Sequence, residues 1–295
     1  MRPASTFQNT IYELGLERYV LELELNGLTV VPPEVHGFGM DRFDVMVELI
    51  LKRSEELTGS SFSLERGPSR KLAFPPAANV LAGKDSDRGE QTQFLLQRLA
   101  SYHRVFRDLA VNPVSVALMR HMIGPRATRF SSHNSFVKWQ GEFGYGPSLG
   151  LHADQNAMPL PWGRMALTAN TNWCLTDYTK DGGAFAYVPG SHRSGGRPTH
   201  DAPRKAVPVE APKGSVIVFH GATWHGAFPR VIPGMRLSVA NYHRHLMVTS
   251  QEDIQGSFPR ELAEDCDNPE LFRELCGFDD GFPYKQQSDR IPKAV

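Results

Sequence analysis

The first third of the chain places apolar residues at helical spacing. In residues 40–57, apolar side chains recur every three or four positions from Phe43 to Ile50, which predicts an amphipathic helix. Residues 90–110 show similar spacing and predict a second helix. Residues 112–124 predict a third, with an asparagine cap, a proline at the first helical position and a glycine at the end.

The pattern then changes to short apolar runs separated by turn residues. Alternation and β-branched or aromatic content predict strands at residues 129–139, 165–176, 184–189, 214–220 and 235–243. An earlier strand is expected within NGLTVVPPEV (26–35), a hairpin turn at KDGG (180–183), and a further helix at 268–278. Several short strands at this spacing favour a β-sandwich or barrel over alternating βαβ units.

Composition allows a large folded core. The chain has 295 residues with 40% hydrophobic content, so it is not disordered by composition. It contains 26 glycines and 22 prolines, a content that favours a turn-rich, β-rich protein. The length permits one large β-rich domain or two small ones. The long polar loop at 191–205, rich in glycine and proline, can fold over a site.

Charge and cysteine usage narrow the class of protein. The 32 basic and 32 acidic side chains balance, so a nucleic-acid or anionic-membrane partner has no electrostatic support. Cys174, Cys266 and Cys276 form no CxxC pair, which argues against a zinc ribbon and a disulfide framework. No signal-peptide core and no apolar run of membrane-spanning length is found. We therefore expect a reduced, soluble, cytoplasmic protein.

A histidine and an aspartate stand one residue apart in the segment LGLHADQNA (149–157). Side chains at i and i+2 of a strand point to the same face, so His152 and Asp154 can converge on one ion. An imidazole and a carboxylate are two of the three ligands in the 2-His-1-carboxylate arrangement that holds Fe(II). An H-x-D triplet also arises by chance in a chain with 11 histidines, so the pair alone leaves both interpretations open.

A third histidine raises the metal interpretation. His225 lies beside a turn on a later predicted strand, Arg236 follows eleven residues on, and Ser238 shares the strand face of Arg236. A guanidinium with a hydroxyl beside it is suited to hold a carboxylate through charge-assisted hydrogen bonds. Two histidines and one aspartate next to a buried arginine predict a metal ion together with an anionic co-substrate.

These residues together resemble the phytanoyl-CoA dioxygenase (PhyH) family of Fe(II)/2-oxoglutarate-dependent oxygenases. The resemblance rests on the H-x-D pair, the distal histidine, the arginine eleven residues later, and NWCLTDYTKDGGAFAYVPGSH between them. NGLTVVPPEV also resembles the N-terminal strand of that family. The resemblance covers most of the chain, and only the loop 191–205 and the C-terminal tail lack a counterpart.

The resemblance implies a mainly β fold with flanking helices. Its core would be a double-stranded β-helix (jelly-roll, cupin-like), within a single Fe(II)/2-oxoglutarate dioxygenase domain spanning residues 1–295. A helical N-terminal part would cover about residues 1–124, the jelly-roll core about 125–248, and a C-terminal extension 249–295.

The resemblance also implies a set of site residues. The metal ligands that it implies are His152, Asp154 and His225. The residues that it implies for the co-substrate 2-oxoglutarate are Arg236, Ser238, Trp173 and, from strand 129–139, Asn134 or Lys138. Arg236 would pair with the carboxylate far from the metal, and Trp173 falls at the position of a tryptophan that lines the co-substrate pocket in relatives.

Four side chains are expected to contact the primary substrate. They are Phe136, His133, Met158 and Trp162. Each also fits ordinary packing: Met158 and Trp162 lie in a loop that is either an apolar lid or simply packed on itself. The same two interpretations apply to His133 and Phe136 on strand 129–139. We expect a mostly apolar pocket with a few polar anchors.

Other histidines compete for the metal-ligand role. His220 precedes His225 by five residues, but its use would lengthen the spacing to Arg236 from eleven to sixteen residues. His243 and His245 share a strand face without a nearby carboxylate in that register, which favours a strand-end pair. His192 in the PGSH segment is expected to brace its loop. The spacing therefore favours His225.

The implied reaction couples 2-oxoglutarate decarboxylation, with release of succinate and CO2, to oxidation of a C–H bond by O2. Asp154 favours hydroxylation over halogenation, because halogenating relatives have glycine or alanine at this position. Desaturation, ring formation and demethylation stay open. A catalytically silent metal-binding module or a zinc-dependent hydrolase on the same fold is the alternative, since zinc accepts the same ligands. A small-molecule substrate and a monomer or homodimer are expected.

Overall fold

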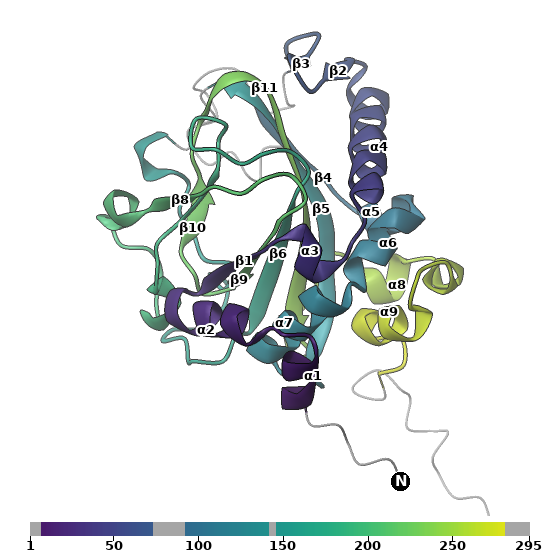
Figure 1. The fold of residues 1–295 in the computed structure, drawn as a ribbon, viewed down its shortest axis with the longest axis vertical. Coiled ribbons are helices and arrows are strands. Elements are labelled where there is room, and N and C mark those ends of the chain that lie inside the picture. The colour runs from purple at the N-terminus through teal and green to yellow at the C-terminus, as the bar shows by residue number, and fades with distance from the viewer. Residues whose placement is uncertain (1–6, 73–91, 142–145, 281–295) are drawn as a thin grey trace, which may run out of the picture.

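Two antiparallel sheets face each other in the computed structural model, which describes residues 7–72, 92–141 and 146–280 (Figure 1). The larger sheet has, in spatial order, β1 (Leu28–Val31), β9 (Val216–His220), β6 (Thr168–Cys174), β11 (Arg230–His245), β5 (Thr128–Gly141) and β4 (Gln93–Leu96). The smaller sheet has β10 (His225–Ala227), β7 (Phe185–Tyr187) and β8 (Val207–Val209). A two-stranded ribbon is formed by β2 (Phe62–Ser63) and β3 (Gly67–Pro68). The predicted jelly-roll fold is confirmed.

The helices lie mostly on the outer face of the larger sheet, away from β8 and β10, whereas α2 (Glu17–Asn26) lies below these strands and contacts β1 (Figure 1). They are α1 (Phe7–Glu13), α2, α3 (Pro33–His36), α4 (Met40–Thr58), α5 (Leu99–Tyr102), α6 (Arg104–Ala110), α7 (Pro113–Ile123), α8 (Ile254–Ser257) and α9 (Pro269–Cys276). The apolar face of α4 packs on the sheet in the main core cluster, as its spacing predicted. Asn112 caps α7 by accepting a hydrogen bond from Ser115 N, also as predicted.

The strands of the larger sheet are buried on both faces, because one face meets the helices and the other meets the smaller sheet. Along β9, Val216 and Val218 belong to the main core under the helices, whereas Ile217 and Phe219 pack with Phe185 of the smaller sheet. This alternation divides every strand into an outer set and an inner set of side chains. The candidate site lies among the inner set.

The predicted helix at residues 90–110 is only partly correct. Residues 93–96 form strand β4, which pairs with β5 with Phe94 opposite Val137, and the helices α5 and α6 follow it. An exposed edge of β5 accepts the strand, so sheet pairing overrides the helical spacing of this segment. Together with β1, this strand shows that the N-terminal part contributes to the same sheet as the core.

The predicted hairpin at residues 180–183 is wrong as a pairing, although a turn is present. Gly183 N donates to Lys180 O at 3.1 Å. The strands on its two sides do not pair with each other, since β6 lies in the larger sheet and β7 in the smaller. The turn therefore carries the chain across from one sheet to the other.

No helix among the described residues has the length and apolar character needed to cross a membrane. The three cysteines are buried and carry free thiols.

Candidate metal centre

A backbone bridge between two distant segments brings two histidines side by side. His152 N donates to His225 O at 2.9 Å, and His225 N donates to His152 O at 2.8 Å. Asp154 follows His152 by two residues, and its Oδ1 lies 3.7 Å from His152 Nε2 and 3.6 Å from His225 Nε2. Within the described part of the chain, this is the one group of three potential ligand atoms lying within 4.8 Å of one another.

Hydrogen bonds orient these three side chains so that one donor atom of each is free. His152 Nδ1 lies 2.9 Å from Gly150 O, and His225 Nδ1 lies 2.9 Å from Thr223 O. A carbonyl oxygen only accepts, so each Nδ1 carries the hydrogen and each Nε2 keeps its lone pair. Asn170 Nδ2 donates to Asp154 Oδ2 at 3.3 Å, which leaves Oδ1 toward the histidines.

The environment also favours metal-ligand chemistry. Burial lowers the pKa of His225 to about 4, with a further lowering by His152 that Asp154 opposes, so the ring is neutral near pH 7. The ring stacks on Phe185 at 5.3 Å and contacts Phe219 at 4.6 Å between centroids. The His152 side chain is 47% exposed, so the centre is dry on one side and open on the other. The donor set fits a divalent transition metal such as Fe(II) or Zn(II).

Three buried basic side chains lie together on the inner face of the larger sheet. Lys138 on β5 stands opposite Arg236 on β11, and Arg230 begins the same strand. All three are at least nine-tenths buried. Their hydrogen-bond partners are neutral backbone carbonyls: Lys138 Nζ donates to Phe228 O at 2.7 Å, Arg236 NH1 to Gly183 O at 2.8 Å, and Arg230 Nε to Gly234 O at 2.8 Å.

No acidic side chain pairs with these three basic side chains among the residues that the structure describes. Burial, together with the charges of Arg236 and Arg230, lowers the pKa of Lys138 to about 6. Burying like charges without counter-ions costs free energy, so such a cluster is expected where an anionic ligand completes it. The cluster therefore fits a carboxylate of a small dianion.

Arg236 is held in place by an aromatic ring. Its Cζ lies 4.9 Å from the ring centroid of Tyr178, which is fully buried and whose hydroxyl accepts a hydrogen bond from Asn172 Nδ2 at 3.2 Å. Arg236 Nε and Ser238 Oγ are buried and make no hydrogen bond. These two polar atoms, on the same face of β11, are available to a carboxylate. Sequence reasoning missed Tyr178, whose only signal is its place just before the turn at 180–183.

Trp173 does not line this site, and the prediction from the family resemblance is wrong. Trp173 pairs with Val239 on β11 and therefore points to the outer face. Its ring packs against His36 at 4.9 Å and Phe38 at 5.9 Å between centroids, within the helix-side core. Asn172, its neighbour, points inward instead.

The prediction that His133 contacts the substrate is also wrong. It stands opposite Asn241 on β11, on the helix side of the sheet, and is completely buried. Its ring makes T-shaped contacts with the rings of Phe106 and Phe130, with centroids 5.8 Å and 5.6 Å away. The packing interpretation therefore holds for His133.

The remaining predicted residues lie closer to the site or in its loop. Asn134 and Phe136 share the inner face with Lys138, opposite Ala240 and Ser238 of β11. Met158 and Trp162 pack together in a small apolar cluster, with Trp162 Nε1 donating to Met158 O at 3.3 Å. Contact of these four side chains with a ligand stays a prediction.

The rival histidines lie outside the group of three donors. His220 Nδ1 accepts a hydrogen bond from Ala222 N, and its ring lies 5.5 Å from that of His192. His243 packs against Phe130 on the helix side, and His245 Nδ1 accepts from Met247 N.

The fold and these side chains define a double-stranded β-helix protein with a two-histidine, one-carboxylate site beside a buried cationic pocket. The family model described as Phytanoyl-CoA dioxygenase (PhyH) matches residues 71–237, more than half of the chain. The chain belongs to this family.

Two curated relatives are dioxygenases of fungi. Dioxygenase af480 of Aspergillus fumigatus is 33% identical over 175 residues, which cover 58% of this chain and 54% of that protein. Dioxygenase aneA of Aspergillus aculeatus is 30% identical over 190 residues, 60% of each chain. The chain thus matches little more than half the length of these relatives.

Two solved structures share the fold at low sequence identity. HygX from Streptomyces hygroscopicus, with nickel and 2-oxoglutarate bound, superimposes with a TM-score of 0.55 at 15% identity, covering 79% of this chain and 88% of that one. The α-ketoglutarate-dependent carbocyclase SnoK from nogalamycin biosynthesis has a TM-score of 0.54 at 18% identity, covering 78% and 83%.

Proposed function

We propose that this chain is a non-haem Fe(II)- and 2-oxoglutarate-dependent dioxygenase that hydroxylates a C–H bond of a small organic substrate. The observation that carries the proposal is the presence of two features between the two sheets: the oriented donors of His152, Asp154 and His225, and the buried basic side chains around Arg236. Family membership supports the same activity.

The three donors would hold Fe(II) through His152 Nε2, Asp154 Oδ1 and His225 Nε2. When bound, the iron supplies O2 activation coupled to oxidative decarboxylation of 2-oxoglutarate to succinate and CO2. The protein keeps both imidazoles in the Nε2-binding tautomer through the Gly150 and Thr223 carbonyls. The rings of Phe185 and Phe219 exclude water from the buried side of His225.

The cationic cluster would bind the carboxylate of 2-oxoglutarate that lies away from the metal. Arg236 offers its unpaired Nε–H, and Ser238 offers its hydroxyl. Lys138 adds a third donor from the neighbouring strand, so we favour it over Asn134 as the contribution of β5. Tyr178 keeps the guanidinium in the orientation needed for this contact.

Two features favour hydroxylation over the alternatives. The Asp154 carboxylate is present and faces both histidines, so no ligand position is vacated for a halide. A zinc hydrolase would use the same three donors but gives no role to the Arg236 cluster. HygX, which shares the fold, has been solved with hygromycin B bound, and this supports a small-molecule substrate here. We further propose a cytoplasmic monomer or homodimer, and the balanced charge gives no electrostatic support for a nucleic-acid partner.

Succinate release from 2-oxoglutarate tests the proposal. We expect the full chain with Fe(II), O2 and 2-oxoglutarate to release succinate slowly, because uncoupled turnover needs no primary substrate. His225→Ala and Arg236→Gln should each abolish it. His200→Ala and Arg204→Gln, which alter exposed side chains of the 191–205 loop, are the matched controls and should retain it. Metal-loaded wild-type protein that releases no succinate, with a panel of candidate substrates present, would contradict the proposal.

A further inference from the structure

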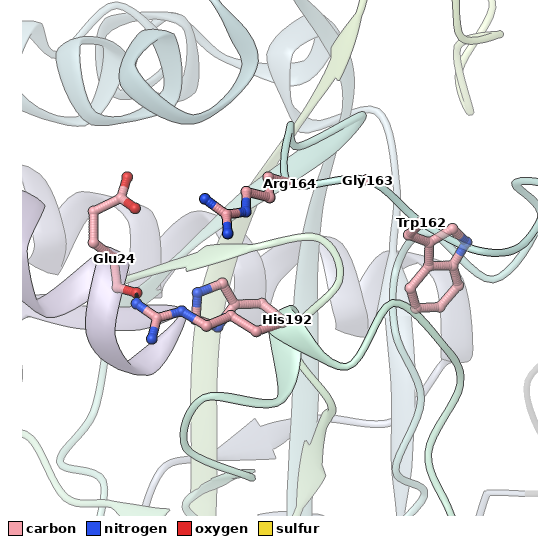
Figure 2. A pocket seen from close by; sticks show the side chains of 6 residues that line it. Glu24, Trp162, Gly163, Arg164 and His192 are labelled. Atoms are coloured by element: carbon pink, nitrogen blue, oxygen red, sulfur yellow. Dashed lines mark hydrogen bonds between the residues drawn. The ribbon is translucent and has the colours of Figure 1, made fainter.

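A cavity lies apart from the metal donors, where the end of α2 meets two loops. Its volume is about 530 Å³, within the range that holds a small-molecule ligand. Six residues line it, and none belongs to the metal centre or the cationic cluster: Glu24, Trp162, Gly163, Arg164, His192 and Arg193. Figure 2 shows the Arg164 guanidinium directed toward the part of the cavity near Glu24, with His192 alongside and Trp162 beyond Gly163.

Two arginines and one glutamate lie on the wall of the cavity, which leaves it with a net positive charge. Among the described residues, neither Arg164 nor Arg193 forms an ion pair, and Arg193 instead donates to the backbone oxygen of Glu24. The Glu24 carboxylate is engaged elsewhere, because its Oε1 lies 2.9 Å from His121 Nε2. Two guanidinium groups on the wall of one cavity, without carboxylate partners, are suited to an anionic ligand.

His192 lines the cavity, and its ring packs beside the buried ring of His220. The rings of His192 and His220 lie 5.5 Å apart between centroids, and His220 is 6% exposed. His220 Nδ1 accepts the Ala222 N–H, so its Nε2 carries the hydrogen, and this N–H faces the backbone of Arg164. His192 Nδ1 lacks a partner. The two histidines therefore shape this wall of the cavity, and Arg164 and Arg193 supply its positive charge.

We propose that this cavity binds the anionic group, a carboxylate or a phosphate monoester, of a small molecule distinct from the co-substrate. Arg164 and Arg193 pair with the anion, His192 adds a polar contact, and the Trp162 ring packs against the organic part of the ligand. Residues 155–165 connect Asp154 to the cavity along the chain, and Gln155 N donates to Gly221 O, next to His220.

Calorimetric titration with two matched probes tests the site. Phenyl phosphate and benzoate share a ring and differ in the anionic group, so they separate the two chemistries. Each is titrated into the full chain loaded anaerobically with Fe(II) and saturating 2-oxoglutarate, which occupies the Arg236 cluster. We expect one probe to bind saturably with one site per chain, and Arg164→Gln to weaken it at least about tenfold.

Controls locate the binding. Arg204→Gln should leave the affinity unchanged, because Arg204 lies on the same loop as Arg193 but does not line the cavity. Arg164→Glu should weaken binding further than Arg164→Gln, by charge repulsion. Three outcomes would overturn the proposal: neither probe binds, Arg164→Gln binds like the wild type, or binding is lost in Arg236→Gln and retained in Arg164→Gln. The last result would place the probe in the co-substrate pocket. Because the test measures binding of a probe and not turnover, its failure leaves the proposed dioxygenase activity standing.

Discussion

His225 Nε2 lies 3.6 Å from Asp154 Oδ1, although the two side chains come from segments far apart in the chain. The contact depends on the reciprocal backbone bridge between His152 and His225, which fixes the two histidines directly opposite each other. Asp154 then joins them through the two-residue repeat of an extended chain. The spacing of the donors is therefore set by backbone hydrogen bonds.

Widening this bridge should weaken metal binding. A Cβ at Gly226 would lie 2.2 Å from Leu149 O and 3.1 Å from Gly150 C, both backbone atoms, so the two segments must separate. We expect Gly226→Ala to lower Fe(II) affinity roughly 10–100-fold, as for other changes that disturb ligand orientation. Anaerobic competition with a chelator measures this. Gly163→Ala, where a Cβ meets nothing within 4 Å, is the control; equal affinities for the two variants would argue against the role of the bridge.

Substitutions at Trp173 and at Tyr178 should have different effects, the first on stability and the second on co-substrate binding. Trp173→Phe removes packing on the helix side, so we expect a loss of about 1–3 kcal/mol in unfolding free energy with unchanged 2-oxoglutarate affinity. Tyr178→Leu removes the ring under Arg236 and should weaken 2-oxoglutarate about tenfold. Tyr178→Phe keeps the ring and serves as the control. Urea unfolding and calorimetry measure the two effects, and a large affinity loss in Trp173→Phe would restore that residue to the co-substrate site.

Binding of 2-oxoglutarate should be accompanied by proton uptake. The pKa of Lys138 is about 6 in the folded protein, chiefly because of burial, so the amine is mostly neutral at pH 7.5. A carboxylate brought beside it favours the ammonium form and raises the pKa. Calorimetry in two buffers with different protonation enthalpies should therefore detect uptake in the wild type and a reduced uptake in Lys138→Met. Equal enthalpies in both buffers for the wild type would contradict this expectation.

Stability should fall as the solution becomes acidic. Burial lowers the pKa of His133 to about 3 and that of His243 to about 4. The unfolded chain, with histidine pKa values near 6.5, binds these protons first, so the unfolding free energy decreases as pH falls below about 6.5. The decrease approaches about 1.4 kcal/mol per pH unit for each histidine. His133→Leu should flatten the curve in urea unfolding between pH 7 and 5, whereas the exposed His200→Ala should follow the wild type.

The inner-face residues of β11 were predictable because a strand has a strict two-residue repeat. Arg236 and Ser238 share a face with each other by that rule, and the structure places them there. The same rule puts Trp173 on the opposite face from Asn172, but its pairing partner on β11 cannot be known without the register. The family resemblance was silent on this register, and the assignment of Trp173 failed for that reason.

Other features of the site needed three-dimensional information. Lys138 emerged as a candidate from its strand, but its burial beside Arg230 and Arg236 depends on the pairing of β5 with β11. Tyr178 reaches the guanidinium from a segment that crosses between sheets, and no local pattern marks such a contact. The cavity at Arg164 joins three segments distant in sequence.

Anaerobic spectroscopic titration tests the central claim most directly, because the Fe(II)–2-oxoglutarate chelate has a visible charge-transfer absorption. We expect the wild type to bind one Fe(II) and one 2-oxoglutarate per chain. Arg236→Gln should retain Fe(II) but require far more 2-oxoglutarate to reach the same absorption, and His225→Ala should bind Fe(II) only weakly. Full iron binding by His225→Ala, or an absorption indifferent to Arg236→Gln, would contradict it.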